Sequence, residues 1–276
     1  MKRLFAIFLA LVVLAGVGLF GLWLSHSRSM FVWAENAASG HANALWHIVH
    51  ELCTPDMKAN GNPAPCVSVD LAGGFAVLKD IQGKTQYLLI PTARVTGIES
   101  PELLAPTSPN YWAAAWDARK LVERGIGHPV LREDIGLAVN SVGGRTQNQL
   151  HIHVDCVLPD IRDTLQRAAP SIGARWSPLV LGRHRHRYRV RWLAGDELAP
   201  GEDPFKILAD TIPSARDDMG DQTLAVIGAT RPNGAPGFIL LEDAGDGTPF
   251  DLAASEELLD HSCKIANEPV AAPGVG

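Results

Sequence analysis

The chain has 276 residues, of which 46% are hydrophobic and 20% are charged, a composition typical of a globular protein with a sizeable core. Its net charge of −6 argues against a general nucleic-acid-binding protein, because such proteins carry an excess of Lys and Arg to neutralise phosphates. The charge does not exclude one small anionic ligand.

The first predicted element is an apolar helix. Residues 4–24 contain no charged side chain and follow Lys2 and Arg3. The run is longer than the apolar core of a secretory signal peptide, about 7–15 residues, and matches the length of a membrane-spanning helix, about 20 residues. We therefore predict a single-pass anchor, with cleavage as the alternative. Lys2 and Arg3 favour the cytoplasmic side, which places the rest of the chain outside.

The chain contains four cysteines, an even number in an exported protein, which predicts disulfides. No Cys-x-x-Cys pair occurs, so the spacing is not that of a zinc knuckle. We expect Cys53 to pair with Cys66 around a small loop and Cys156 to pair with Cys263. Four buried free thiols are the alternative.

Hydrophobic spacing and turn residues place the elements of the first half. Apolar residues at helical spacing predict a helix at 42–52, and two short apolar runs around a glycine turn predict a hairpin at 74–78 and 85–90. A Ser-Pro pair begins a predicted helix at 108–125. A strand is expected at 135–140.

The most informative stretch is a strand that follows Gly143 and Gly144. Polar and apolar residues alternate along 149–156, which is typical of a half-buried strand and places His151 and His153 on one face. A neutral imidazole is a nucleophile near pH 7, and backbone N–H groups of a glycine turn can hold phosphate oxygens. The alternatives are a metal site, since His-x-His is a common ligand spacing, and two ordinary hydrogen-bonded histidines.

The second half carries weaker signals. Along 183–192, arginines alternate with other residues, which indicates a strand; its basic face either meets anionic lipid head groups or is a solvated surface that discourages edge pairing. Further elements are expected as helices at 159–169, 203–209 and 255–261 and as a hairpin at 223–229 and 237–241.

Gln149-Leu150-His151-Ile152-His153-Val154 resembles the active-site strand of the histidine-triad superfamily, His-φ-His-φ-His-φ-φ with φ apolar, except at the first position. Residues 144–160, Gly-Arg-Thr-Gln-Asn-x-x-His-Ile-His-x-x-Cys-Val-x-Pro-Asp, resemble one family within it, the bacterial CDP-diacylglycerol pyrophosphatases. Segments at 87–92, 97–101 and 260–263 are also similar to that family. The resemblance covers roughly residues 1–265.

The resemblance implies an α+β fold, namely a histidine-triad-like antiparallel sheet with flanking helices, in addition to the N-terminal transmembrane helix. The second half loosely repeats the element order of the first without its histidines, so we hypothesise an internal pseudo-dimer with one working site. The expected parts are the transmembrane anchor (4–24), the catalytic half (42–170), a degenerate half (171–265) and a tail (266–276).

The implied activity is hydrolysis of CDP-diacylglycerol to CMP and phosphatidate. His151 corresponds to the nucleophile that forms a cytidylyl–histidine intermediate, and His153 to the triad residue that contacts the phosphoryl oxygens. No metal or other cofactor is expected. The candidates for binding the phosphates are Asn140, Gly144, Thr146, Gln147 and Gln149.

Gln149 is the departure from the family pattern, because it replaces a histidine that could protonate a leaving group. Phosphatidate is a phosphate monoester with a second pKa of about 6, so it leaves as a stable anion without an acid. The substitution therefore favours pyrophosphate cleavage.

Two other functions remain open from the sequence. One is a nucleotidyl transferase of the same superfamily that uses an acceptor other than water. The other is a non-catalytic metal- or lipid-binding envelope protein. The expected partner is the membrane lipid substrate, not nucleic acid, and the expected location is the inner membrane with the catalytic domain in the periplasm. The sequence does not predict the oligomeric state.

Overall fold

The computed structural model describes residues 41–182, 185–199, 201–245 and 251–267. The chain divides into two compact units, Met1–Ala44 and Leu45–Gly276, and the second contains the sheet. The anchor expected at residues 4–24 lies outside the described residues. Within the part that is described, no helix is both long and apolar enough to cross a bilayer.

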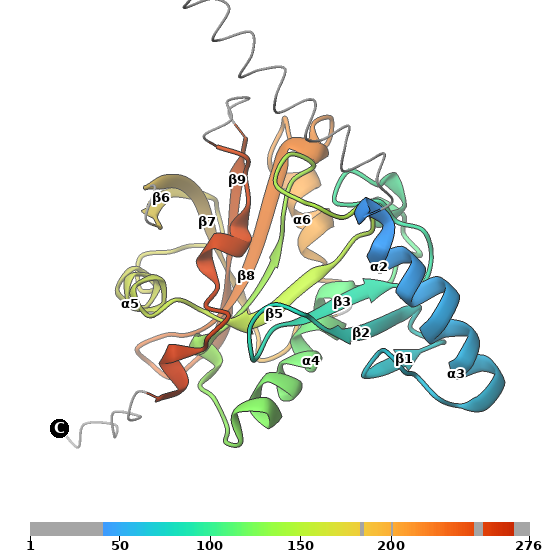
Figure 1. The fold of residues 1–276 in the computed structure, drawn as a ribbon. Coiled ribbons are helices and arrows are strands. Elements are labelled where there is room, and N and C mark those ends of the chain that lie inside the picture. Colours follow the sequence, from blue (N-terminus) through green and yellow to red (C-terminus); the bar gives the residue numbers. More distant parts are fainter. Residues whose placement is uncertain (1–40, 183–184, 200, 246–250, 268–276) are drawn as a thin grey trace, which may run out of the picture. The chain divides into compact units, whose positions relative to one another are not determined.

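Across the described ranges, the sheet is antiparallel with nine strands in the order β1-β2-β3-β5-β4-β8-β9-β7-β6 (Figure 1). Its central pairings are β3 with β5, β5 with β4 and β4 with β8. The strands are β1 (Ser68–Asp70), β2 (Phe75–Lys79), β3 (Tyr87–Pro91), β4 (Ile135–Val139), β5 (Ile152–Cys156), β6 (Ser177–Leu181), β7 (His186–Ala194), β8 (Gln222–Thr230) and β9 (Pro236–Ala244).

Few helices accompany the sheet. The α-helices are α2 (Ala44–His47), α3 (Thr54–Asn60), α4 (Tyr111–Ile126), α5 (Pro159–Ala168) and α6 (Pro204–Thr211). A π-helical segment, η2 (Ile48–Cys53), joins α2 to α3. Short 3₁₀ turns are η1 (His41–Asn43), η3 (Pro101–Leu104), η4 (Arg132–Asp134), η5 (Met219–Asp221), η6 (Ser255–Leu258) and η7 (Lys264–Asn267).

The described residues form three apolar clusters, one of which packs η2 against β2 and β3. On one face α4 and α6 bury Trp112, Trp116 and Phe205 against strand residues that include Val154. On the other face α5 packs against β7, β8 and β9, and the chain after β9 crosses back over the sheet, where the carbonyl of Leu258 accepts from the N–H of Leu158 at 3.0 Å. Figure 1 shows this C-terminal segment in red beside β8 and β5.

Local signals set the ends of α4. The predicted start at residue 108 is too early, because Asn110 is the N-cap residue and its side chain accepts from the Ala113 N–H at 3.2 Å. The helix ends at Gly127, which has a left-handed φ of 91° that a glycine adopts without strain. The helix expected at 255–261 is shorter than predicted, since only the turn η6 forms there.

The predicted fold class was wrong. It combined a histidine-triad-like sheet, flanking helices, a hypothetical pseudo-dimer and a transmembrane helix. The structure is mostly one nine-stranded antiparallel sheet with few helices, because β4 pairs with β8 over four residue pairs and joins strands from both halves of the chain. The proposed division into residues 42–170 and 171–265 stays a prediction, although both ranges contribute strands to this sheet.

Both expected disulfides are confirmed. Cys53 is bonded to Cys66, and Cys156 is bonded to Cys263 across 107 residues of sequence. The second bond joins the end of β5 to the chain just before η7. It therefore ties the C-terminal segment to the strand that contains His153 and directly follows His151.

Candidate active site

The two histidines lie at the start of β5, where His151 directly precedes the strand and His153 lies within it; the strand expected over 149–156 therefore begins three residues later than predicted. Ile152 and Val154 point into the apolar cluster under α4, whereas His151 and His153 lie on the opposite face. Their rings pack edge to face with centroids 4.8 Å apart, and both are buried, with exposed fractions of 8% and 4%. The sheet therefore holds two imidazoles side by side and nearly out of water.

A backbone contact fixes the tautomer of His151. Its Nδ1 lies 2.8 Å from the carbonyl oxygen of Gln149. Because a carbonyl oxygen only accepts, the proton must be on Nδ1 and the lone pair on Nε2. Burial lowers the pKa of His151, although the Gln149 carbonyl and the charge of Glu256 oppose this shift. His151 is therefore neutral near pH 7, with Nε2 able to act as a base, a nucleophile or a metal ligand.

The partners of His153 are side chains from two other segments. Its Nδ1 lies 2.6 Å from Nε2 of Gln86, which precedes β3, and 3.3 Å from Oε1 of Glu256, which is carried by η6. Its Nε2 is buried and has no hydrogen-bond partner among the described residues. Burial and the neighbouring His151 lower the pKa of His153, so this ring is also neutral near pH 7.

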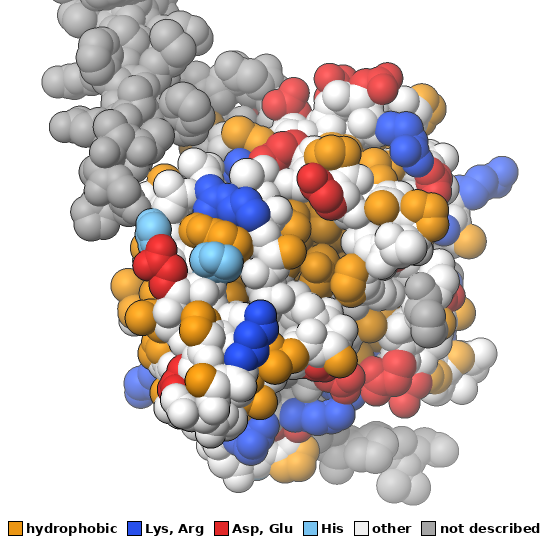
Figure 2. All heavy atoms as spheres, turned by 90° about the vertical axis from the view of Figure 1, so that its right-hand side faces the viewer, with side chains coloured by type: hydrophobic (Ala, Val, Ile, Leu, Met, Phe, Trp, Pro, Cys, Tyr) orange, Lys and Arg blue, Asp and Glu red, His pale blue; other side chains and the backbone are white. Residues whose placement is uncertain are grey.

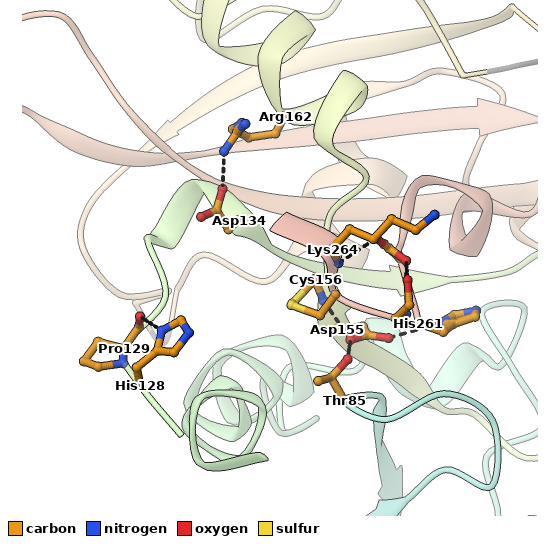
Figure 3. Close-up of a disulfide and its surroundings, with 12 residues drawn as sticks. Thr85, His128, Pro129, Asp134, Asp155, Cys156, Arg162, His261 and Lys264 are labelled. Carbon is orange, nitrogen blue, oxygen red and sulfur yellow. Dashed lines mark hydrogen bonds and ion pairs between the residues drawn. A yellow bond between two sulfur atoms is a disulfide. The ribbon is translucent and has the colours of Figure 1, made fainter. Parts of the chain in front are cut away.

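A third histidine lies at the edge of this cluster. Nδ1 of His261 lies 3.1 Å from Oδ2 of Asp155, and its Nε2 lies 3.4 Å from Oε1 of Glu256. These two carboxylates raise the pKa of His261 to about 10, so the ring carries a positive charge at neutral pH. Figure 3 shows Asp155 between Thr85 and His261, beside the Cys156 disulfide.

The residues expected to bind phosphate lie in different environments. Asn140 is buried and joins the histidine cluster through Glu256: its Nδ2 donates to Oε2 at 3.0 Å and its Oδ1 accepts from the Glu256 N–H at 3.1 Å. Gly144 donates its N–H to Oγ of Ser141 at 3.0 Å, so this group already has a partner. Thr146 is exposed.

Two glutamines of the predicted site contact other parts of the chain. Oε1 of Gln147 accepts from the N–H of Leu45 at 3.2 Å. Gln149 is fully buried, and its Nε2 donates to the carbonyls of Pro91 at 3.0 Å and Ala93 at 2.9 Å. The residue at the position of the first triad histidine therefore holds the chain that leaves β3. The roles assigned to these residues stay predictions.

Charges near the glycine turn are paired. Both terminal nitrogens of Arg145 bond to the carboxylate of Glu99, at 2.5 and 2.8 Å. Burial alone would raise the pKa of Glu99, but hydrogen bonds from Arg145 and Thr96 lower it below its ordinary value. Figure 2 shows the side of the molecule that carries α2 and α3, where basic, acidic and apolar side chains are interspersed.

Potential metal ligands gather at another place. In the described ranges, the one group of three His, Cys, Asp or Glu side chains with ligand atoms within 4.8 Å of one another is His186, Asp243 and Asp251. It includes neither His151 nor His153. The expectation that the enzyme uses no metal stays a prediction.

Three side chains of this cluster were not predicted from the sequence, namely Gln86, Glu256 and His261. One signal could have found His261, because a Cys156–Cys263 bond places residue 261 beside residue 155. Gln86 and Glu256 carry no such signal, since their contacts depend on the pairing of β3 with β5 and on the path of the chain after β9.

Comparison with known proteins gives two findings. A family model described as CDP-diacylglycerol pyrophosphatase matches residues 40–267. A curated CDP-diacylglycerol pyrophosphatase of Yersinia pestis is 44% identical to the chain over 226 residues, which are 82% of this chain and 85% of that relative. The family match includes β5 and also the segment that carries Glu256 and His261.

Proposed function

Because the chain belongs to the CDP-diacylglycerol pyrophosphatase family, a family of hydrolases, we propose that it cleaves CDP-diacylglycerol to CMP and phosphatidate with His151 as the nucleophile. The observation that carries the assignment to His151 is the 2.8 Å contact between its Nδ1 and the Gln149 carbonyl. This contact leaves the lone pair on Nε2, which needs no separate base to attack phosphorus.

In the first step, Nε2 of His151 attacks the phosphorus bonded to cytidine. The bond from that phosphorus to the bridging oxygen breaks, and phosphatidate leaves with the electron pair. The ring becomes a cytidylyl-imidazolium whose Nδ1–H remains bonded to the Gln149 carbonyl, which stabilises the new positive charge. In the second step water attacks the same phosphorus, the N–P bond breaks, and CMP and a proton are released.

His153 supports the same chemistry. Its Nε2 is buried, has no partner within the described residues and belongs to a ring adjacent to His151. An N–H at this position can donate to a phosphoryl oxygen as negative charge develops there, and such a bond is strong in a site that excludes water.

Gln149 cannot replace the missing acid, because both donors of its amide are used by the carbonyls of Pro91 and Ala93. The proposed substrate does not require one, since phosphatidate leaves as a stable anion. Gln149 instead holds the chain after β3 next to β5. We expect Gln149→His to lower activity through lost anchoring of this loop, and a gain in activity would count against that role.

We also place the catalytic residues outside the cytoplasm, at the periplasmic face of the inner membrane. Two disulfides among four cysteines support an oxidising compartment, and a substrate with two acyl chains stays in the bilayer. Accessibility of the folded enzyme to protease in spheroplasts tests this location, and complete protection would refute it.

The direct test of the mechanism is capture of the intermediate. CDP-diacylglycerol carrying radioactive phosphorus next to cytidine is mixed with enzyme and denatured in alkali, which preserves phosphohistidine bonds. We expect label on one peptide, at His151, and none in His151→Asn. The matched control is His128→Asn, an exposed histidine whose Nδ1 contacts the Pro129 carbonyl, and it should be labelled as the wild type is. Label on another residue, or active enzyme that is never labelled, would contradict the proposal.

A further inference from the structure

The carboxylate of Glu256 is the meeting point of four polar side chains from distant parts of the chain. Its Oε1 lies 3.1 Å from Nε2 of Gln86, 3.3 Å from Nδ1 of His153 and 3.4 Å from Nε2 of His261. Its Oε2 accepts from Asn140 at 3.0 Å. Such a carboxylate determines which way each neighbouring donor must point.

Ionised Glu256 fixes the orientation of Gln86. If the amide of Gln86 were reversed, its oxygen would face Oε1 of Glu256 at 3.1 Å, which is repulsive. The amide nitrogen must therefore face both Glu256 and His153. Because that nitrogen only donates, Nδ1 of His153 accepts at 2.6 Å, and the ring proton is on Nε2.

His261 supplies the charge that keeps Glu256 ionised. Burial alone would raise the pKa of Glu256, but the hydrogen bond from His261 and its other neighbours hold the pKa well below its ordinary value. His261 is itself held by Asp155, which is fully buried and whose other oxygen accepts from Thr85 at 2.6 Å and from the Cys156 N–H at 2.8 Å.

The disulfide places this ring. Cys156 follows Asp155 directly, and Cys263 lies two residues after His261. The carbonyl of His261 also accepts from the Lys84 N–H at 3.0 Å, in the turn before β3. Covalent and backbone bonds thus hold the imidazolium between Asp155 and Glu256.

We propose that His261 is a positioning residue: bound to Asp155, it holds the Glu256 carboxylate against Gln86 and His153 and so keeps His153 as an Nε2–H donor toward the substrate's phosphoryl oxygen. The inference rests on the proposed function for its catalytic consequence, but the tautomer of His153 is measurable without turnover. The groups that face His261 are Asp155 on β5 and Glu256 on η6, and no proton is transferred by His261 in this role.

Removal of the imidazolium has a defined consequence. In His261→Asn the Glu256 carboxylate loses its cation and gains affinity for a proton, which allows Gln86 to turn. The proton of His153 then moves to Nδ1, and a lone pair at Nε2 faces the anionic phosphoryl oxygen. We expect kcat to fall about 10- to 100-fold, the range found when residues that orient metal-binding histidines are changed.

The test combines kinetics with NMR of protein labelled with ¹⁵N at histidine, in which the two ring nitrogens of His153 report the site of the proton. Wild type should show protonated Nε2, and His261→Asn should show protonated Nδ1 together with the lower kcat. His261→Lys restores a cation and should recover both in part. His128→Asn, the exposed control, should change neither.

Two results would overturn the inference: an unchanged His153 tautomer in His261→Asn, even with a lower kcat, or a changed tautomer with kcat within twofold of wild type. If His261→Asn does not fold, His261→Gln is measured in its place, with the same expected and contradicting outcomes. The intermediate-capture experiment tests His151 independently of His153. Failure of the proposed function would appear as absent labelling of His151, whereas failure of the positioning role would appear in the tautomer of His153 or in kcat.

Discussion

Strands β5 and β7 both alternate basic side chains with apolar ones, but the structure uses them differently. His153 on β5 and His151 just before it are buried, and Nε2 of His153 has no partner among the described residues. On β7 the side chain of Arg189 is 42% exposed, yet it makes two bonds to the fully buried carboxylate of Glu242, at 2.5 and 2.6 Å. Arg191 lies over the ring of Trp176.

The difference shows that a sequence pattern does not by itself indicate a binding surface. Arg189 and Arg191 belong to the basic face that the sequence suggested for binding lipid head groups. In the structure, Arg189 binds Glu242 of the same sheet and Arg191 lies over the ring of Trp176. Within the described part of the chain, the contacts of His151 and His153 are made by their Nδ1 atoms, and Nε2 of His153 is buried without a partner. Available polar atoms inside the protein are costly to maintain, so their presence favours a functional role.

The largest expected effect is a loss of activity when a histidine at β5 is replaced, compared with no loss when an exposed arginine of β7 is replaced. We expect His151→Ala to lower kcat at least about 10³-fold, because loss of a covalent nucleophile leaves only binding and charge stabilisation. On β7, Arg187→Ala removes an exposed side chain and should leave kcat within twofold. Initial rates of CMP release check both variants. Equal losses would remove the functional distinction between β5 and β7.

The second largest expected effect is a loss of stability when the Cys156–Cys263 disulfide is removed, because this bond holds the C-terminal segment against β5. In the chain-entropy model a loop of about 100 residues contributes about 4.7 kcal/mol and one of about 15 residues about 3 kcal/mol. The Cys156–Cys263 bond spans 107 residues and the Cys53–Cys66 bond spans 13. Replacing both cysteines of the long bridge with Ser should therefore lower the free energy of unfolding more, as measured in denaturant.

The two double cysteine variants also test whether activity depends on the position of the C-terminal segment. Loss of the long bridge should also lower kcat, because it frees the segment that carries His261. Loss of the short bridge should not. Equal kcat values in the two folded variants would show that the C-terminal segment keeps its position without the Cys156–Cys263 bond.

A smaller effect is expected on β7. Arg189→Met leaves the buried carboxylate of Glu242 without its two charge-assisted bonds, which should lower the free energy of unfolding by about 1–3 kcal/mol. Arg187→Met, the exposed neighbour, should change it by less than about 0.5 kcal/mol. Chemical unfolding measures both, and kcat should stay unchanged. A large loss of activity in Arg189→Met would give β7 a role that its contacts do not indicate.

The smallest effect is a pH dependence. Burial lowers the pKa of His151, so the fraction of neutral nucleophile persists to lower pH than it would for a free imidazole. A pKa of 6.5 would halve kcat/KM at pH 6.5, and we expect a smaller loss there. The profile of kcat/KM between pH 5 and 8 measures it. An acidic limb centred at or above pH 6.5 would mean that His151 is not shielded as the structure indicates.

Local patterns gave much of the secondary structure. The alternation along β5, the two β-hairpins and the cysteine pairs could be interpreted without the fold, because each depends on residues close in sequence or on simple counting. Strands β1 and β6 were not predicted, since their short edge segments carry little periodicity. The pairing of β4 with β8 has no local sequence signal, because it joins residues far apart in the chain.

The sequence alone determined that His151 and His153 point to the same side of the chain, because side chains alternate along any extended backbone. Only the tertiary structure decided what surrounds them. Gln86 and Glu256 are 170 residues apart in the sequence, and His261 lies further along the chain. All three meet at β5 because sheet pairing and the Cys156–Cys263 bond place them there. Those neighbours set the protonation of each imidazole, so the protonation is determined by the tertiary structure and cannot be predicted from the sequence motif.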